Sequence, residues 1–303
     1  AAGLYRELIA PVAELVARSE RVLILPDGPL HRLPFGALAH DGRFLIEEKP
    51  LHTALSLTAY GTLRAFAPAA GPTKLVAFGD PRFPKDMQAK SDLGPGLRSF
   101  DWSSLAHSRR EVERIAGIYP GALLYLGEEA TEERAKAVRE AHILHFATHG
   151  YTNDTTPLDS GLVLTIPEKL SQGRENGLLQ VWEIFESVRI DADLVVLSAC
   201  ESALGRELSG EGLIGLTRAF QYAGARSVAA SLWNVADQVT AELMARFYRH
   251  LAAGLPKDQA LREAQLELIR KPVRLTTAKG QVIETDASSP FFWAAFQLFG
   301  DWR

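Results

Sequence analysis

Short apolar runs alternate with amphipathic stretches through most of residues 74–270, and this alternation constrains the fold more than any other feature of the sequence. Each apolar run has the length of a single buried strand. The runs expected to form strands are residues 74–79, 122–126, 143–148, 193–199 and 227–232, with a hairpin formed by 161–166 and 177–181. The expected helices span residues 106–118, 131–140, 212–222, 239–252 and 257–270. This alternation predicts an α/β/α sandwich with a mostly parallel central sheet covered by helices on both faces.

The residues before this pattern are expected to form an accessory region, residues 1–72, beside a main domain at 73–303. A segment rich in Pro and Gly, residues 67–73, marks the boundary. Residues 1–19 predict one amphipathic helix, and the Pro26–Pro29 turn predicts a hairpin of two extended pieces.

Composition excludes several classes of protein. The net charge is −4 and there is no long run of Lys or Arg, so we expect neither nucleic acid nor a membrane as a partner. The apolar runs are too short to span a bilayer, and residues 1–19 do not resemble a signal peptide, which favours a cytoplasmic protein. The single cysteine excludes an intramolecular disulfide and a multi-cysteine zinc site. We expect no cofactor.

Two residues with catalytic potential follow two of the predicted strands. His149 comes directly after the strand at 143–148, and Cys200 follows the strand at 193–199, 51 residues later. Active sites of such sheets lie beyond the carboxyl ends of the strands. A thiol becomes a nucleophile when a neighbouring histidine helps to deprotonate it. A lone cysteine is by itself more typical of a buried apolar position, so its place at a strand end decides between the two interpretations.

Two other patterns near these residues have simpler interpretations. His142, His145 and His149 have spacings that could gather a metal ion on a helix, but the stretch is typical of a strand and no carboxylates complete a site. We therefore expect no metal, and expect His145 to be a packed residue or one that supports the site. Gly210–Gly212 lacks the Lys-Ser/Thr of a phosphate-binding loop and indicates close packing near the active site.

Several sequence blocks together resemble one family. The blocks are HFATHG (145–150), LVVLSACESALG (194–205), GEGLIGLTRAFQYAGARSVAASLWNVAD (210–237) and FFWAAFQLFGDW (291–302), supported by LPFGAL (33–38) and LVAFGDP (75–81). They resemble the CHAT family, caspase-like peptidases related to separase, and caspases likewise place His about 50 residues before Cys. The resemblance implies a caspase-like fold and a cysteine endopeptidase in which His149 is the base and Cys200 the nucleophile. The backbone N–H groups of Gly150 and Cys200 could form an oxyanion hole.

The resemblance leaves the substrate pocket open. The position two residues before the nucleophile is acidic in metacaspases and legumains but is the neutral Ser198 here. By similarity to separase and caspases, Ser231, Trp233 and Asn234 border the substrate. Asp237 and Asp159 are the acidic candidates for binding a basic side chain before the cleaved bond, although an exposed loop Asp is more often a turn or cap residue. Preference for Asp at that position is not expected.

The expected partners are proteins. The family resemblance implies one dedicated protein substrate, in the manner of a bacterial effector, and control by a sensor or by tetratricopeptide repeats. The segments 85–104 and 167–177 are candidates for regulatory ordering or self-cleavage. The alternative function is a caspase-like interaction module without activity.

Overall fold

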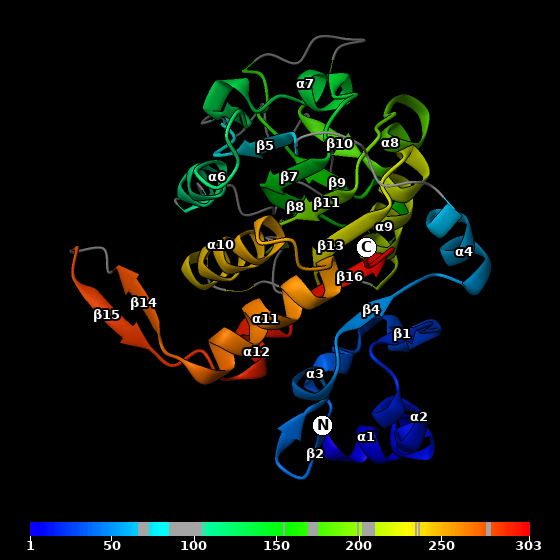
Figure 1. The fold of residues 1–303 in the computed structure, drawn as a ribbon. Coiled ribbons are helices and arrows are strands. Elements are labelled where there is room, and N and C mark those ends of the chain that lie inside the picture. Colours follow the sequence, from blue (N-terminus) through cyan, green and yellow to red (C-terminus); the bar gives the residue numbers. More distant parts are fainter. Residues whose placement is uncertain are drawn as a thin grey trace.

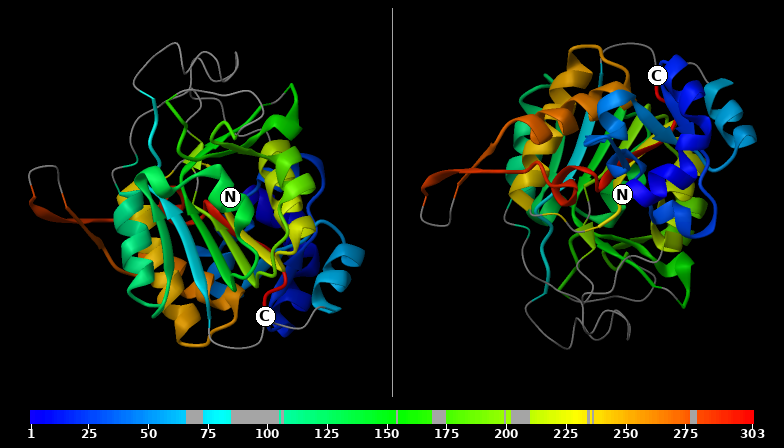
Figure 2. Two further views of the ribbon diagram at one scale, coloured as in Figure 1. Left: turned by 90° about the horizontal axis from the view of Figure 1, so that it is seen from above. Right: turned by 90° about the horizontal axis from the view of Figure 1, so that it is seen from below.

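The protein is built on an eight-stranded sheet with helices on both faces (Figures 1 and 2). The computed structural model describes residues 1–65, 73–84, 105, 107–153, 155–168, 175–198, 200–201, 210–233, 235, 237–276 and 280–303. In spatial order the sheet contains β1 (Val22–Ile24), β4 (Leu51–Thr53), β16 (Phe296–Gly300), β13 (Ser227–Ser231), β11 (Leu194–Leu197), β7 (Ile143–Ala147), β5 (Leu75–Gly79) and β6 (Leu123–Leu126). Only the β13–β16 pair is antiparallel within this sheet, so the prediction of a mostly parallel sheet is confirmed.

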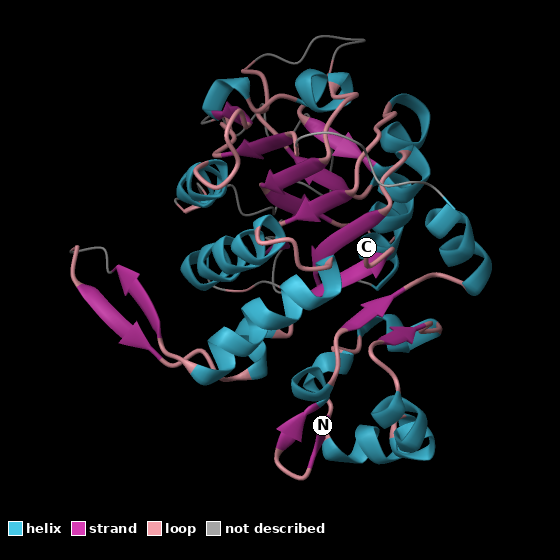
Figure 3. Ribbon diagram, viewed as in Figure 1, coloured by secondary structure: helices cyan, strands magenta, loops and turns pink. Residues whose placement is uncertain are grey.

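Strand alternation separates two layers of core. On β11, Val195 and Leu197 face one cluster, whereas Leu194 and Val196 face the other. The first cluster includes α7 (Glu132–Ala137), α8 (Val181–Ser187) and α9 (Gly210–Ala223). The second includes α6 (Ser108–Ala116), α10 (Asp237–Ala252) and α11 (Lys257–Arg270). The predicted helices are thus present, and they form the outer layers of the α/β/α sandwich (Figure 3).

A smaller sheet continues from the carboxyl ends of two central strands. Its order is β10 (Leu178–Gln180), β9 (Gly161–Val163), β8 (His149–Tyr151) and β12 (Cys200–Glu201). The pair β9–β10 is the predicted hairpin, with antiparallel pairing of Leu179 and Leu162. β8 follows β7 and β12 follows β11 along the chain. β8 and β12 are therefore neighbours in the smaller sheet, as β7 and β11 are in the central sheet.

The N-terminal region differs from the prediction in two places. The single helix expected over residues 1–19 is divided into α1 (Ala2–Leu8), the 3-10 turn η1 (Ala10–Val12) and α2 (Ala13–Arg18). Pro11 explains the break, because its nitrogen cannot donate an α-helical hydrogen bond. The chain from the second half of the Pro26–Pro29 stretch onward forms the 3-10 helix η2 (Gly28–Arg32) instead of an extended piece. The hairpin of this region lies later, at β2 (Ala39–His40) and β3 (Arg43–Phe44).

The remaining elements complete the N-terminal region and the surface. They are η3 (Phe35–Ala37), α3 (Leu45–Glu48), α4 (Leu57–Ala65), η5 (Gly127–Glu129), η6 (Pro157–Asp159) and α12 (Pro290–Trp293). A two-stranded ribbon, β14 (Val273–Thr276) and β15 (Val282–Thr285), projects from the body (Figure 1). Through β4 the N-terminal region joins the central sheet beside β16. Within the described residues, no helix combines the length and the apolar character needed to cross a membrane.

Candidate active site

His149 and Cys200 lie opposite each other on paired strands. In the central sheet β7 and β11 run parallel, with Ile143 aligned to Leu194. In the smaller sheet β8 and β12 also run parallel, with His149 aligned to Cys200. The same 51-residue offset therefore holds on both sides of the bend between the sheets. Neighbouring strands are roughly 4.8 Å apart, so the two backbones are adjacent. Of Cys200 the structure describes the backbone only.

The strand that carries His149 is held on both sides. His149 is aligned with Val163 of β9 as well as with Cys200 of β12. Its side chain is 2% exposed, and its ring centroid lies 5.4 Å from that of Phe83. Gly150, the next residue, is aligned with Leu162 and with Glu201. The fold therefore fixes the position of the imidazole through pairing and burial together.

His145 lies within the core of the same region. Its side chain is fully buried, and Nδ1 lies 3.0 Å from the hydroxyl of Tyr248. Its Nε2 lies 3.1 Å from Oε1 of Glu111, close enough for an ion pair but not aligned for a hydrogen bond. The pKa of Tyr248 is raised well above its usual value, mainly by burial and to a smaller extent by the neighbouring Tyr119 and Glu111. The phenol therefore stays protonated. His145 is thus packed between β7 and the helices α6 and α10. This is one of the two roles predicted for it.

A small polar cavity lies under the carboxyl ends of β7 and β11. Its volume is about 20 Å³, which is room for about one water molecule and too little for a peptide side chain. Buried oxygens of Glu111, Ser198 and Thr240 have no hydrogen-bond partner within the described residues. The cavity is lined by Leu105, Ser108, Glu111, Ala147, Thr148, Ser198 and Thr240. Ser198, a predicted pocket residue, therefore faces a buried polar space two residues before Cys200.

The other predicted pocket residues are spread over several elements. Ser231 is buried at the end of β13 and donates a hydrogen bond to the carbonyl of Trp233 at 2.6 Å. The Trp233 indole N–H donates to the carbonyl of Phe291 in α12 at 2.9 Å. Asn234 lies outside the described residues. Asp237 begins α10, and its side chain is likewise outside them.

Asp159 behaves as a turn residue. It ends η6, and its carboxylate accepts a hydrogen bond from the hydroxyl of Thr156, while its backbone carbonyl accepts one from Gln180. These contacts fit the turn or cap role typical of a loop Asp. They do not bring Asp159 to the aligned pair of His149 and Cys200, and its predicted place in the substrate pocket stays a prediction.

Close packing fixes the start of α9 beside β8. A Cβ atom built on Gly212 would come within 2.8 Å of Cγ2 of Thr152, the residue that follows β8. Such a separation is far below van der Waals contact, so a side chain here would displace its neighbour. The Gly210–Gly212 stretch belongs to the first turn of α9. The expected close packing near the candidate site is therefore present.

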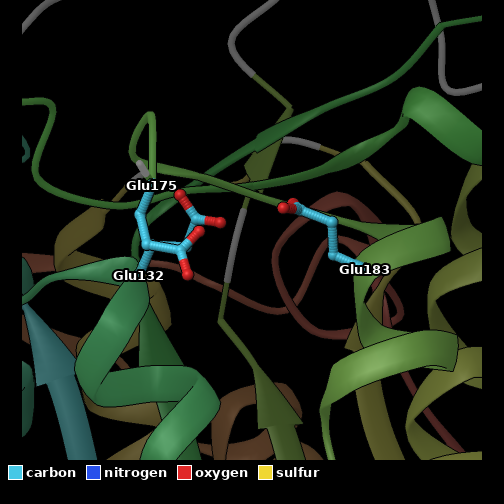
Figure 4. A group of neighbouring side chains, drawn as sticks. All are labelled: Glu132, Glu175 and Glu183. Atoms are coloured by element: carbon cyan, nitrogen blue, oxygen red, sulfur yellow. The ribbon is translucent and has the colours of Figure 1, made fainter. Parts of the chain in front are cut away.

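A second group of charges, buried or half-buried and absent from the sequence expectations, lies between α7, the chain before β10 and α8. Glu132, Glu175 and Glu183 turn their carboxylates toward one another (Figure 4). The ammonium of Lys136 contacts all three, at 2.6, 2.8 and 2.8 Å respectively. Burial is the largest cause that raises the pKa of Glu132. Lys136 already supplies the cation for this cluster, so three neighbouring carboxylates do not indicate a metal site. In the sequence, the four-residue spacing of Glu132 and Lys136 is the local pattern that could have indicated this cluster.

The central sheet, its helical layers and the strand ends that carry His149 and Cys200 define a caspase-like α/β fold. Part of one chain in a crystal structure of the separase–securin complex of Saccharomyces cerevisiae is similar in fold: it aligns with a TM-score of 0.52 and 12% sequence identity, over 92% of this chain and 16% of the other. This chain belongs to the CHAT domain family, which it matches over residues 1–301.

Two named relatives are longer proteins. Tetratricopeptide repeat protein 28 of Homo sapiens is 28% identical over 98% of this chain, and that of Mus musculus is 27% identical over the same share. The chain spans 13% of the length of each of these relatives.

Proposed function

We propose that this protein is a cysteine endopeptidase with a dyad of Cys200 and His149. The observation that carries the proposal is the alignment of Cys200 with His149 on paired parallel strands at the carboxyl edge of the sheet. Membership of the CHAT family and the caspase-like fold support the same reaction class. His149 is already fixed by burial and by pairing on both sides, which suits a base that must meet one nucleophile.

The proposed reaction is acyl transfer in two steps. His149 accepts the proton of the Cys200 thiol, and the thiolate attacks the carbonyl carbon of the cleaved peptide bond. The C–N bond then breaks, and the amine leaves with the proton from His149. Water, deprotonated by His149, attacks the thioester and releases the new carboxylate and the thiol. The N–H groups of Gly150 and Cys200 are the proposed donors to the oxyanion.

The substrate side of the proposal is a protein chain. Ser198, Ser231, Trp233, Asn234 and Asp237 remain the proposed border of the pocket, with Asp159 as a second acidic candidate. A basic residue before the cleaved bond is the working hypothesis for specificity, since Asp237 and Asp159 carry the negative charge that would bind it. A cleavage profile on a peptide library tests it, and equal turnover of basic and neutral residues at that position would contradict it.

Covalent labelling tests the dyad directly. A panel of peptidyl acyloxymethyl ketones with Arg, Leu or Asp next to the warhead should give one adduct on the native protein, located at the only cysteine. His149→Ala should slow labelling by about 10²–10³-fold, because the thiol loses its base. Cys200→Ala should give no adduct. Equal rates for His149→Ala and the native protein would remove His149 as the base.

The second candidate function is an interaction module without activity, favoured by the similarity to a tetratricopeptide repeat protein. In that case no ketone of the panel labels the folded protein, whereas iodoacetamide labels the denatured chain at Cys200. Control by a sensor or by repeats, and a role as a bacterial effector, belong to the peptidase proposal. Co-expression with candidate substrates, comparing the native protein with Cys200→Ala, would identify a cleaved product.

A further inference from the structure

The turn that follows β5 is a third strand end beside the candidate active site. β5 pairs with β7, and Gly79 at its end is aligned with Ala147, two residues before His149. The next residue, Asp80, has a φ of 52°, in the left-handed region that residues other than glycine rarely occupy. Such conformations cluster at functional sites, where the surrounding structure holds them in place. The proposed acyl transfer uses none of the residues of this turn.

Side chains of α6 hold the first half of the turn. The carboxylate of Asp80 accepts a hydrogen bond from Nε of Arg109 at 2.9 Å, and Nη2 of the same guanidinium lies 2.8 Å from it. The backbone N–H of Asp80 donates to the hydroxyl of Ser108 at 2.9 Å. Asp80 is buried, so solvent screens its ion pair with Arg109 less than it would screen an exposed pair. One helix therefore holds the residue with the unusual φ through both its carboxylate and its N–H.

The second half of the turn is tied to the chain after β9. The backbone N–H of Arg82 donates to the hydroxyl of Thr165, and its carbonyl accepts from the N–H of Ile166, both at 3.0 Å. β9 itself pairs with β8, where Val163 is aligned with His149. The turn and His149 are therefore anchored to one continuous stretch of chain, which fixes their separation.

Phe83, the next residue of the turn, packs against the imidazole of His149. The two ring centroids are 5.4 Å apart, and the ring planes are inclined by 36°. Phe83 is half-buried. It also packs against a small apolar cluster formed by Tyr151, Val163, Ile166 and Leu178. Because these contacts fix the phenyl ring, its position beside the imidazole is set by the fold.

The contact has two physical consequences for the imidazole. A phenyl ring packed against it leaves it little room to rotate, because protein interiors are close-packed. An aromatic ring whose centroid lies within about 6 Å of a cation also attracts that cation, so Phe83 favours the protonated form of His149. A base that takes a proton from a thiol must be held in one orientation and must then carry the positive charge. Both consequences suit the proposed role of His149.

We propose that Phe83 is a positioning residue for the imidazole of His149. Its phenyl ring fixes the orientation of the imidazole and stabilises the imidazolium that forms when His149 accepts the proton of the Cys200 thiol. The ion pair of Asp80 with Arg109 holds the turn that presents the ring. This inference rests on the proposed peptidase function and adds a third strand end to the same site.

Labelling by the ketone that reacts fastest with the native protein tests the role of the ring. Phe83→Leu keeps an apolar side chain but removes the ring, and should slow labelling by about tenfold. Phe83→Tyr keeps the ring and should stay within about threefold of the native rate. The matched control is Phe185→Leu, because Phe185 is also half-buried and contacts another ring, that of Tyr222, at 5.3 Å. Equal rates for Phe83→Leu and Phe185→Leu would overturn the proposal.

The pH dependence of labelling separates positioning from a loss of stability. Without the phenyl ring the imidazolium is less stable, so His149 loses its proton at a lower pH. The limb of the profile set by His149, identified by its loss in His149→Ala, should therefore move to lower pH by about half a unit in Phe83→Leu. Phe83→Tyr should keep the native profile, and circular dichroism confirms that each variant is folded. An unmoved limb in Phe83→Leu would contradict stabilisation of the imidazolium.

Removal of one arginine tests how the turn is held. Arg109→Leu removes both contacts to the carboxylate of Asp80 and should slow labelling by about threefold, because the turn keeps its other anchors. Arg110→Leu is the matched control, since Arg110 is an exposed neighbour on the same helix, and it should label at the native rate. Equal slowing by the two variants would show that the ion pair does not hold the turn.

Proton NMR of the Cys200→Ala protein tests the contact without any reaction. The ring current of Phe83 shifts the imidazole signals of His149, which are identified by their loss when His149→Ala is added. Adding Phe83→Leu should move these signals, whereas adding Phe185→Leu should leave them in place. Failure of every ketone to label the native protein would defeat the peptidase proposal. Unmoved imidazole signals, together with native labelling rates for Phe83→Leu, would defeat the positioning role alone.

Discussion

The strand-end site and the N-terminal region are held in place differently. His149 and Cys200 are placed by the pairing of β8 with β12, and both strands continue from buried strands of the central sheet. The N-terminal region instead joins the body through β4, which lies beside β16, and through η2, which lies against α9. The site is thus fixed by main-chain register, and the N-terminal region by how it attaches to the body.

That attachment combines apolar packing of Ala37, Ile46 and Leu51 against the second core cluster with several polar contacts. Thr53 of β4 is aligned with Phe299 of β16, and its hydroxyl donates to the carbonyl of Leu298. Arg21 forms an ion pair with the buried carboxylate of Asp258 at 2.7 Å. His52, also on β4, is buried with its Nδ1 3.8 Å from the same carboxylate. Conditions that weaken these contacts should therefore affect the N-terminal region before the strand-end site.

The largest effect should come from the nucleophile. Cys200→Ala removes the attacking atom and should reduce peptide cleavage by about 10³-fold or more without unfolding the protein. A fluorogenic peptide assay and a thermal melt check the two parts. Undiminished cleavage by the variant would contradict the assignment.

Loss of the cation that contacts the three carboxylates should be the next largest effect. Lys136→Met leaves three carboxylates together, two of them on the buried residues Glu132 and Glu183, and should lower the free energy of unfolding by about 3–5 kcal/mol. The matched control is Lys74→Met, because the Lys74–Glu140 pair is exposed at 3.5 Å and should be worth about 1 kcal/mol or less. Urea unfolding measures both, and equal losses would mean that Lys136 does not act as an internal counter-ion.

Acid should weaken the attachment of the N-terminal region through His52. Burial, the largest cause, and the nearby Arg21 lower the pKa of His52 to about 4. Below pH 6.5 His52 becomes protonated in the unfolded chain but stays neutral in the folded protein. The free energy of unfolding therefore falls as the pH falls toward 4. The loss attributable to His52 should reach about 3 kcal/mol.

His52→Gln should remove that part of the pH dependence, as measured by urea unfolding between pH 7 and 4. His40→Gln, at an exposed histidine of the same region, should keep the slope of the native protein. If the slopes of all three proteins coincide, burial of His52 does not contribute to the acid sensitivity.

The smallest effect separates two glycines of α9. Gly212→Ala forces a Cβ against Thr152 beside β8, and should cost about 1–3 kcal/mol of stability and reduce cleavage. Gly215→Ala places its Cβ 3.7 Å from Val181, an ordinary contact, and should gain up to about 1 kcal/mol through helix propensity. Thermal melts compare the two, and equal stability would show that Thr152 adapts without cost.

The strand-end site was visible in the sequence because both of its residues follow apolar runs. The strands ending before His149 and Cys200 could be recognised separately, and the rule for parallel sheets placed both residues at the carboxyl edge of the sheet. The pairing of β7 with β11, which makes the two strand ends neighbours, came only from the structure. The contact of Phe83 with His149 had no such signal, since the two residues meet only through tertiary packing. The Lys136 cluster was equally hidden, because Glu175 and Glu183 come to it from other segments. The break at Pro11 could have been expected from proline chemistry alone.

The order of the central sheet also bears on how the protein is made. Strand β16, residues 296–300, lies between β4 and β13. During synthesis from the N-terminus, β1 and β4 emerge early but have no place in the sheet until β16 has left the ribosome. The N-terminal region can therefore take its place beside β16 only after residues 296–300 have been translated. A nascent chain would hold its two strand-end residues before its first two strands could join the sheet.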